Sequence, residues 1–235
     1  MRFIKKNEQA PDCLNQLVKQ YKQPKTCYDK LTKNKKNKEC KNLIQQQMLE
    51  EQQYLCAYCE RKVENNNDVI HIEHIRPRLH YLEKVCDYKN LILSCHGSQC
   101  PDVNQADYQG EIHSCGHHPA KGNYFDEAKF LNPVELTDIS DYFSYRIDEG
   151  RIDSSEKDTI KADYMIRLLN LDNPYLNNGR INARKALLKM VQKSSQNKQE
   201  AIKIFKQLLN LNHPPAFISY LRYYFHHSFN ISDSN

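Results

Sequence analysis

Cysteine and histidine are concentrated in one stretch of this chain, and their clustering constrains the fold more than any other feature. Six of the nine cysteines lie between positions 56 and 115, and seven of the ten histidines lie between 71 and 118. An odd number of cysteines excludes a complete set of disulfides within the chain. Clustered thiols and imidazoles are typical of a metal site. We therefore expect a fold organised around bound metal near its centre.

The remaining composition indicates a cytoplasmic globular protein. A chain of 235 residues can bury a core that needs no disulfides, so we expect its thiols to stay reduced. The mean hydropathy is −0.83 and no run of about 18 apolar residues occurs, so we expect no membrane span. The first eight residues become polar too early for a secretory signal. The net charge of +5 is a mild bias toward nucleic acid.

Apolar residues with helical spacing occur on both sides of the cysteine-rich stretch. Residues 11–22 and 40–54 predict two helices, and four more helical patterns follow residue 156, the last over 215–229. Alternation within residues 137–153 predicts a strand followed by a turn. Between the first two helices, residues 30–41 hold six lysines against one glutamate, which suits either a phosphate-contacting arm or a solvated loop or helix start.

These patterns predict an α+β protein in three parts. Residues 1–50 form a helical segment with a basic stretch, residues 51–135 a metal-rich core, and residues 136–235 a mainly helical domain. Aromatic side chains in the last helix suit either a hydrophobic core or a surface that docks a partner.

A structural zinc ion is the first metal that the motifs predict. Cys56 and Cys59 form a CxxC turn, which points two thiolates the same way. Zinc takes four ligands in a structural site, and we assign Cys95 and Cys115 as the second pair because Cys95 ends an apolar run and Cys115 begins a turn. The competing ligands are Cys100 and, as imidazole substitutes, His96, His113 and His117.

Glu73 and His74 form the pair with the most reactive chemistry. They lie near the end of an alternating, strand-like stretch that Pro77 terminates. A carboxylate suits Mg²⁺ or Mn²⁺, and a neutral imidazole can take a proton from water near pH 7. Since alternation places neighbours on opposite faces, the strand must end here for both to serve one site. His71 shares the face of Glu73, and we interpret it as a half-buried side chain.

Two later segments complete the constellation. Asn90 precedes the apolar run that leads to Cys95, and its amide can bridge backbone groups across a loop. The segment that begins at Cys115 then supplies two adjacent imidazoles and a lysine. We regard the basic side chains around this centre as candidate phosphate contacts, namely Arg76, Arg78, Lys84, Lys89 and Lys121.

The order of these motifs resembles that of the HNH endonucleases, which have the ββα-metal fold, in the variety stabilised by a four-cysteine zinc site. The resemblance implies a nuclease with structural Zn²⁺ and catalytic Mg²⁺ or Mn²⁺. By matching position, Glu73 would bind the catalytic ion, His74 would be the general base and Asn90 would stiffen the loop. The His-x-x-Lys spacing favours His118 as the second ligand of that ion, with His117 as the alternative. Many relatives have aspartate at the position of Glu73, and the closing segment is longer here than usual.

Flanking segments extend the resemblance to one branch of the family. Residues 1–6, 130–133 and 167–173 are similar to those of the PtuB family, the HNH component of Septu and of certain retron anti-phage systems. That resemblance implies a PtuA-type ATPase partner and a role in phage defence. The expected substrate is nucleic acid, either DNA or RNA, with DNA favoured. The alternative function is a zinc-stabilised nucleic-acid-binding or adaptor protein whose HNH centre is inactive.

Overall fold

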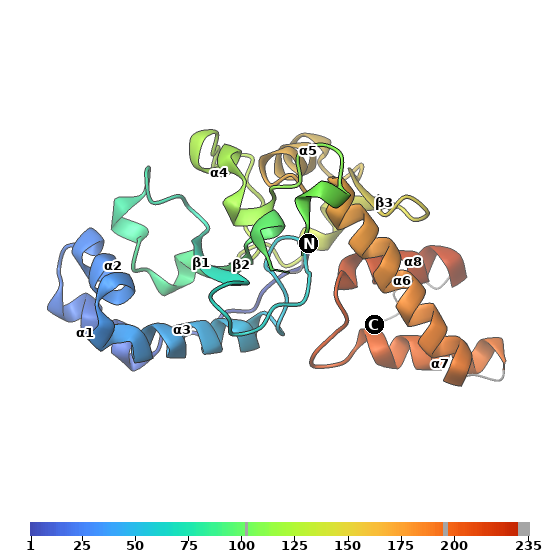
Figure 1. Ribbon diagram of the computed structural model, residues 1–235, viewed down its shortest axis with the longest axis horizontal. Coiled ribbons are helices and arrows are strands. Elements are labelled where there is room, and N and C mark those ends of the chain that lie inside the picture. Colours follow the sequence, from blue (N-terminus) through green and yellow to red (C-terminus); the bar gives the residue numbers. More distant parts are fainter. Residues whose placement is uncertain (102, 195–196, 230–235) are drawn as a thin grey trace.

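Helices at the two ends of the chain flank a small central sheet (Figure 1). The computed structural model describes residues 1–101, 103–194 and 197–229. The elements before the core are α1 (Asp12–Gln20), α2 (Pro24–Lys33) and α3 (Lys38–Glu51). The core contains β1 (Ile70–His74), β2 (Leu91–Cys95) and α4 (Pro119–Asn123). The elements after it are β3 (Phe143–Arg146), β4 (Arg151–Ser154), α5 (Thr159–Leu168), α6 (Pro174–Ser194), α7 (Lys198–Leu209) and α8 (Ile218–Phe229).

The predicted α+β class is confirmed. Two antiparallel sheets of two strands each, β1–β2 and β3–β4, lie among the helices of the described residues. The buried hydrophobic side chains of all three predicted parts belong to one cluster, so these parts share a core. No helix of the described residues is both long enough and apolar enough to cross a membrane. The final six residues of the predicted 136–235 part lie outside the described residues.

The basic stretch runs from the end of α2 to the start of α3. Pro24 is at the first turn of α2, where the missing N–H costs nothing, and Cys27 and Leu31 are buried on one face. The six lysines of residues 30–41 fall on the end of α2, a short 3₁₀ turn and the start of α3. These lysines therefore lie at helix ends and in the turn between them, which agrees with the interpretation of this stretch as a solvated loop or helix start.

One thiol expectation is wrong. Cys13 in α1 and Cys40 in α3 form a disulfide, with Cα atoms 5.7 Å apart, so not every cysteine is reduced. Helix α2 packs against both α1 and α3, and α1 also contacts α3 directly. This packing brings the two thiols within bonding distance although 27 positions separate them. Outside this pair, Cys27 and Cys86 are free and their sulfur atoms lie 2.7 Å apart.

The β1–β2 ladder sets the positions of the central side chains. Its register pairs Ile70 with Cys95 and His74 with Leu91. Gln52, which is 1% exposed, binds the free edge of β2 by accepting from the Leu93 N–H (2.7 Å) and donating to the Leu93 carbonyl (2.9 Å). This buried amide satisfies backbone groups that would otherwise lack partners. The end of α3 is thereby fixed against the sheet.

Candidate metal and catalytic centre

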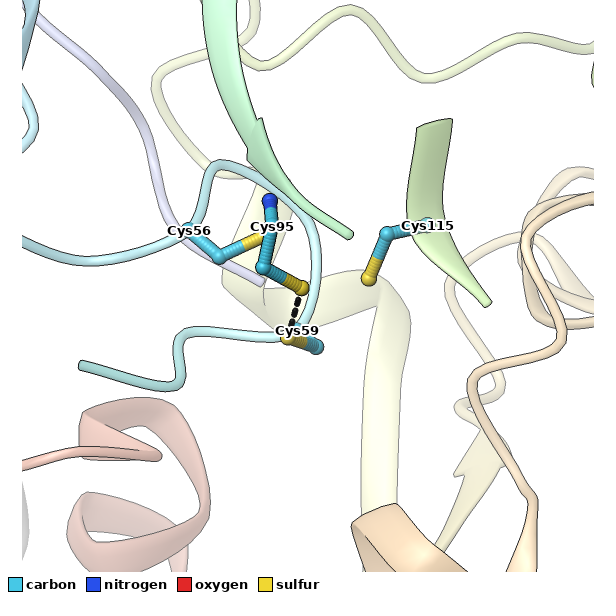
Figure 2. A group of neighbouring side chains, drawn as sticks. All are labelled: Cys56, Cys59, Cys95 and Cys115. Carbon is cyan, nitrogen blue, oxygen red and sulfur yellow. Dashed lines mark hydrogen bonds between the residues drawn. The ribbon is translucent and has the colours of Figure 1, made fainter. Parts of the chain in front are cut away.

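Four buried sulfur atoms converge at one end of the sheet. Cys56, Cys59, Cys95 and Cys115 each offer a sulfur within 4.8 Å of the others, and Figure 2 shows the Cys115 side chain pointing toward the other three. Cys59 and Cys95 are 3.7 Å apart at sulfur. Thiolates about 2.3 Å from a tetrahedral zinc ion lie about 3.8 Å from one another. The cluster therefore fits a structural zinc ion.

Backbone geometry explains why these four thiols meet. The CxxC turn closes through the Cys56 N–H, which donates to Arg61 O (2.9 Å), and the Cys95 N–H donates to the Cys56 sulfur (3.3 Å). Cys115 has a φ of 60°, an uncommon conformation for a residue with a Cβ. Its N–H donates to Leu169 O (2.8 Å), so the chain leaving α5 holds this turn in place.

The predicted pairing of Cys95 and Cys115 with the CxxC turn is confirmed as a cluster able to hold a metal ion. Cys100 is outside this group, and its sulfur lies 3.7 Å from Val69 O. Burial raises the pKa of Cys56, but hydrogen bonds from Cys115, Cys59 and Cys95 outweigh it and lower that pKa well below its usual value. A thiolate is the form that binds zinc.

A cleft of about 700 Å³ opens beside this cluster. Strand β1 ends at His74, as the alternation required, and both Glu73 and His74 line the cleft. Lys25 and Arg78 also line it and are exposed, so two cations are available to a phosphate. Arg76, another predicted phosphate contact, forms ion pairs with Glu127 and Glu135.

Glu73 is ionised and has partners on both oxygens. Its Oε1 pairs with the Lys121 ammonium, and its Oε2 lies 3.1 Å from His71 Nε2. Burial raises its pKa, but the charge of Lys121 and the contacts of His71 outweigh burial and lower the pKa to about 2. Lys121 itself is 3% exposed and also donates to His74 O at 2.5 Å. This lysine, predicted as a phosphate contact, is the buried counter-ion of Glu73.

The surroundings of His74 define which nitrogen is basic. Its Nε2 lies 3.1 Å from the Val85 carbonyl, which can only accept, so Nε2 carries the proton and Nδ1 is left with the lone pair. The Tyr28 ring packs edge-on at 4.8 Å between centroids. Burial is the main reason that the pKa of His74 is lowered to about 4. The imidazole is therefore neutral at physiological pH and can accept a proton.

Asn90 links the backbone on both sides of the cleft loop. Its Oδ1 accepts from the Arg76 N–H (2.8 Å), and its Nδ2 donates to Arg76 O (3.2 Å) and Lys84 O (3.1 Å). The side chain is 1% exposed. These contacts span the loop that carries Val85, so they support the bracing role predicted for Asn90.

A second group of candidate ligands lies next to Glu73. His71, His96 and His117 offer nitrogens within 4.8 Å of one another. Their ring centroids are 5.2 Å apart for His71 and His96, 4.1 Å for His71 and His117, and 4.6 Å for His96 and His117. Sequence reasoning treated His71 as a half-buried residue and His96 only as a substitute zinc ligand. The two signals that pointed to this group are the shared strand face of His71 and Glu73 and the position of His96 directly after Cys95.

The structure does not bring His118 into this group. Its Nδ1 lies 2.8 Å from Leu168 O, and His118 does not line the cleft. His117, the alternative ligand, lines the cleft and contacts His71. The geometry of the described residues thus favours His117 over His118 beside Glu73.

Comparison with known proteins adds no family. No protein-family model matches the chain, and no curated protein matches it at a significant level.

Proposed function

We propose that the cleft hydrolyses phosphodiester bonds and that the chain is a metal-dependent endonuclease of the HNH type. The observation that carries this proposal is the pairing of an ionised carboxylate, Glu73, with a neutral buried imidazole, His74, at the end of one strand. Both line a cleft with exposed cations at its rim and a four-cysteine cluster beside it. The same arrangement agrees with the order of motifs that resembles the HNH endonucleases.

His74 would act as the general base. Because Val85 O holds its Nε2–H, the Nδ1 lone pair would accept a proton from the attacking water. Lys25 and Arg78 would hold the phosphate backbone at the rim of the cleft. Lys121 would keep Glu73 ionised.

A divalent ion at this site would stabilise negative charge that develops on the phosphate oxygens. The resemblance assigns Mg²⁺ or Mn²⁺ to this role, with Glu73 and His118 as ligands and His117 as the alternative to His118. His117 fits, because it lines the cleft. Glu73 can be a ligand only if the ion displaces Lys121 or His71 from its carboxylate, since these two side chains contact its two oxygens.

The test is a cleavage assay on plasmid DNA and on structured RNA, with Zn²⁺, Mn²⁺ or Mg²⁺ supplied in turn. His74→Ala should lower the cleavage rate by about 10²–10⁴-fold, since general bases contribute that much. The matched control is His80→Gln, an exposed histidine in the segment that follows β1, which does not line the cleft. A His74→Ala protein that cuts as fast as wild type would overturn the base assignment. A wild-type protein that binds nucleic acid but never cuts it, with or without an ATPase partner, would favour the adaptor function.

We propose further that the nuclease works in the cytoplasm within an anti-phage complex that includes a PtuA-type ATPase, in some cases with a retron. The support is the similarity of residues 1–6, 130–133 and 167–173 to the PtuB family. Co-expression with such an ATPase, followed by a plaque assay, tests this proposal. Equal plaque numbers with wild type and with His74→Ala would contradict it.

A further inference from the structure

We infer that His71, His96 and His117 form a second metal centre, which binds a transition ion such as Zn²⁺ in preference to Mg²⁺. The three imidazoles come from β1, from the residue after β2 and from the turn after Cys115. Imidazole nitrogens about 2.1 Å from one zinc ion lie about 3.4 Å apart. The observed separations, all within 4.8 Å, are close enough for small ring rotations to close the set.

Two ring nitrogens of this group lack a hydrogen-bond partner among the described residues. His71 Nδ1 and His96 Nε2 are buried and, among the described residues, have no hydrogen-bond partner. A buried polar atom without a partner is costly, so such atoms indicate a missing ligand. Two of them on touching rings indicate a single ligand that accepts both lone pairs.

The opposite nitrogen of each ring is occupied, as expected of metal-bound histidines. His71 Nε2 faces Glu73 Oε2 at 3.1 Å, and His117 Nδ1 donates to Gln99 Oε1 at 3.1 Å. His96 hydrogen-bonds to the backbone of Ile70. Carboxylate, amide and carbonyl oxygens accept here, so the outer nitrogens carry the protons and the inner ones keep their lone pairs.

Donor chemistry then selects the ion. Three neutral imidazoles suit zinc, nickel, copper or iron, whereas Mg²⁺ prefers carboxylate, carbonyl and water oxygens. A three-histidine site leaves a fourth position open for water or substrate. His71 and His117 also line the cleft, so an ion held here is within reach of a phosphate that enters it. The catalytic role of this centre rests on the proposed nuclease function. In that nuclease the three histidines hold the hydrolytic ion, and Glu73 orients His71, one of the ligands of the ion.

Gly116 is fitted to this arrangement. A Cβ built there would lie 2.6 Å from Glu73 Oε2 and 2.8 Å from His71 Nε2. The backbone between Cys115 and His117 thus passes against the carboxylate–imidazole pair at a distance that only glycine allows.

Metal content after dialysis tests the centre without any cleavage assay. The full-length protein, loaded with Zn²⁺ in excess Mg²⁺, should retain two zinc ions per chain, and His96→Gln should retain one. His80→Gln is the control and should retain two. Loading with Co²⁺ separates the sites, because only the cysteine cluster gives thiolate-to-metal charge transfer. His96→Gln should keep that band, which also shows that the variant folds, and should lose only the part of the visible absorption that Co²⁺ at the histidine centre contributes.

Each outcome decides one proposal. One zinc ion per chain in the wild type, or two in both His96→Gln and His117→Gln, would overturn the histidine centre. If the wild type retains two zinc ions and His96→Gln retains one, but the wild type never cleaves nucleic acid, the histidine centre is kept and the nuclease is rejected. Cleavage that persists in Mg²⁺ with His96→Gln would keep the nuclease and reject the centre as its ion site.

Discussion

Asn90→Ala should destabilise the protein through the loop that orients His74. The substitution removes three hydrogen bonds, one from the Arg76 N–H and one each to Arg76 O and Lys84 O. At about 0.5–1.5 kcal/mol per bond, the loss is about 2–4 kcal/mol, because the three backbone groups left behind are part-buried and regain only some of their hydrogen bonding from water. Val85, whose carbonyl holds His74, follows Lys84 directly, so the cleavage rate should fall as well.

The assay is thermal unfolding of the zinc-loaded protein, followed by circular dichroism. For a chain of this size, a loss of 2–4 kcal/mol lowers the melting temperature by about 5–15 °C. Asn104→Ala is the matched control, because that side chain also makes hydrogen bonds, to Ala106 and Asp107, but it is exposed. It should change the melting temperature by only a small fraction of the Asn90 effect. Equal melting temperatures for Asn90→Ala and wild type would refute the bracing role.

Three further outcomes are expected. Cys95→Ser should lose the zinc ion of the cysteine cluster and melt at a lower temperature, while Cys100→Ser should keep the ion, as measured by metal analysis; equal zinc content in the two variants would contradict the ligand assignment. Gly116→Ala should weaken zinc binding at the histidine centre by about 10–100-fold in a competition titration, because its Cβ displaces the partner of a ligand; Gly122→Ala, which meets nothing within 4 Å, should not. Because burial lowers the pKa of His74 to about 4, its basic form persists as pH falls to about 5, so single-turnover cleavage at saturating metal should show no loss that titrates near pH 6.5.

Short-range patterns in the sequence were enough to predict β1, β2, β3 and the cysteine cluster, while β4 was not foreseen. The alternation that ends at Pro77 defines β1, because a strand that buries one face leaves a period-two signature, and the apolar run before Cys95 defines β2, because that strand is buried throughout. A CxxC turn is likewise a local feature. Cys115 is assigned from its chemistry and from the turn that it begins, but its position in space depends on a backbone hydrogen bond to Leu169 O that no local pattern encodes.

Helix α2 and the disulfide show where local patterns fail. In α2 only Cys27 and Leu31 are buried. Two apolar positions followed by lysines are too few to give a recognisable helical pattern in the sequence. The Cys13–Cys40 bond needs α1 and α3 to meet, and α2 is the element that packs against both. A chain in which α2 is not foreseen therefore offers no reason to pair these two thiols.

Choosing between His117 and His118 required the path of the backbone rather than motif spacing. The spacing to Lys121 favours His118, and that lysine does reach Glu73. A 3₁₀ turn over Cys115–His117 nevertheless comes first, and it directs His117 to His71 while His118 caps α4 and faces Leu168. Adjacent residues in a turn point in different directions, so a shift of one position changes the ligand.

The long excursion between β2 and Cys115 links the two metal groups. Cys95 and Cys115, at the two ends of this excursion, belong to the cysteine cluster. His96 directly follows Cys95 and His117 lies two positions after Cys115, and both belong to the histidine group. An ion in the cysteine cluster fixes both ends of the excursion, and with them two of the three imidazoles. Zinc at the four cysteines should therefore organise the histidine centre, and its removal should abolish binding at both sites. The reverse should not hold, since the sulfur ligands do not depend on the imidazoles.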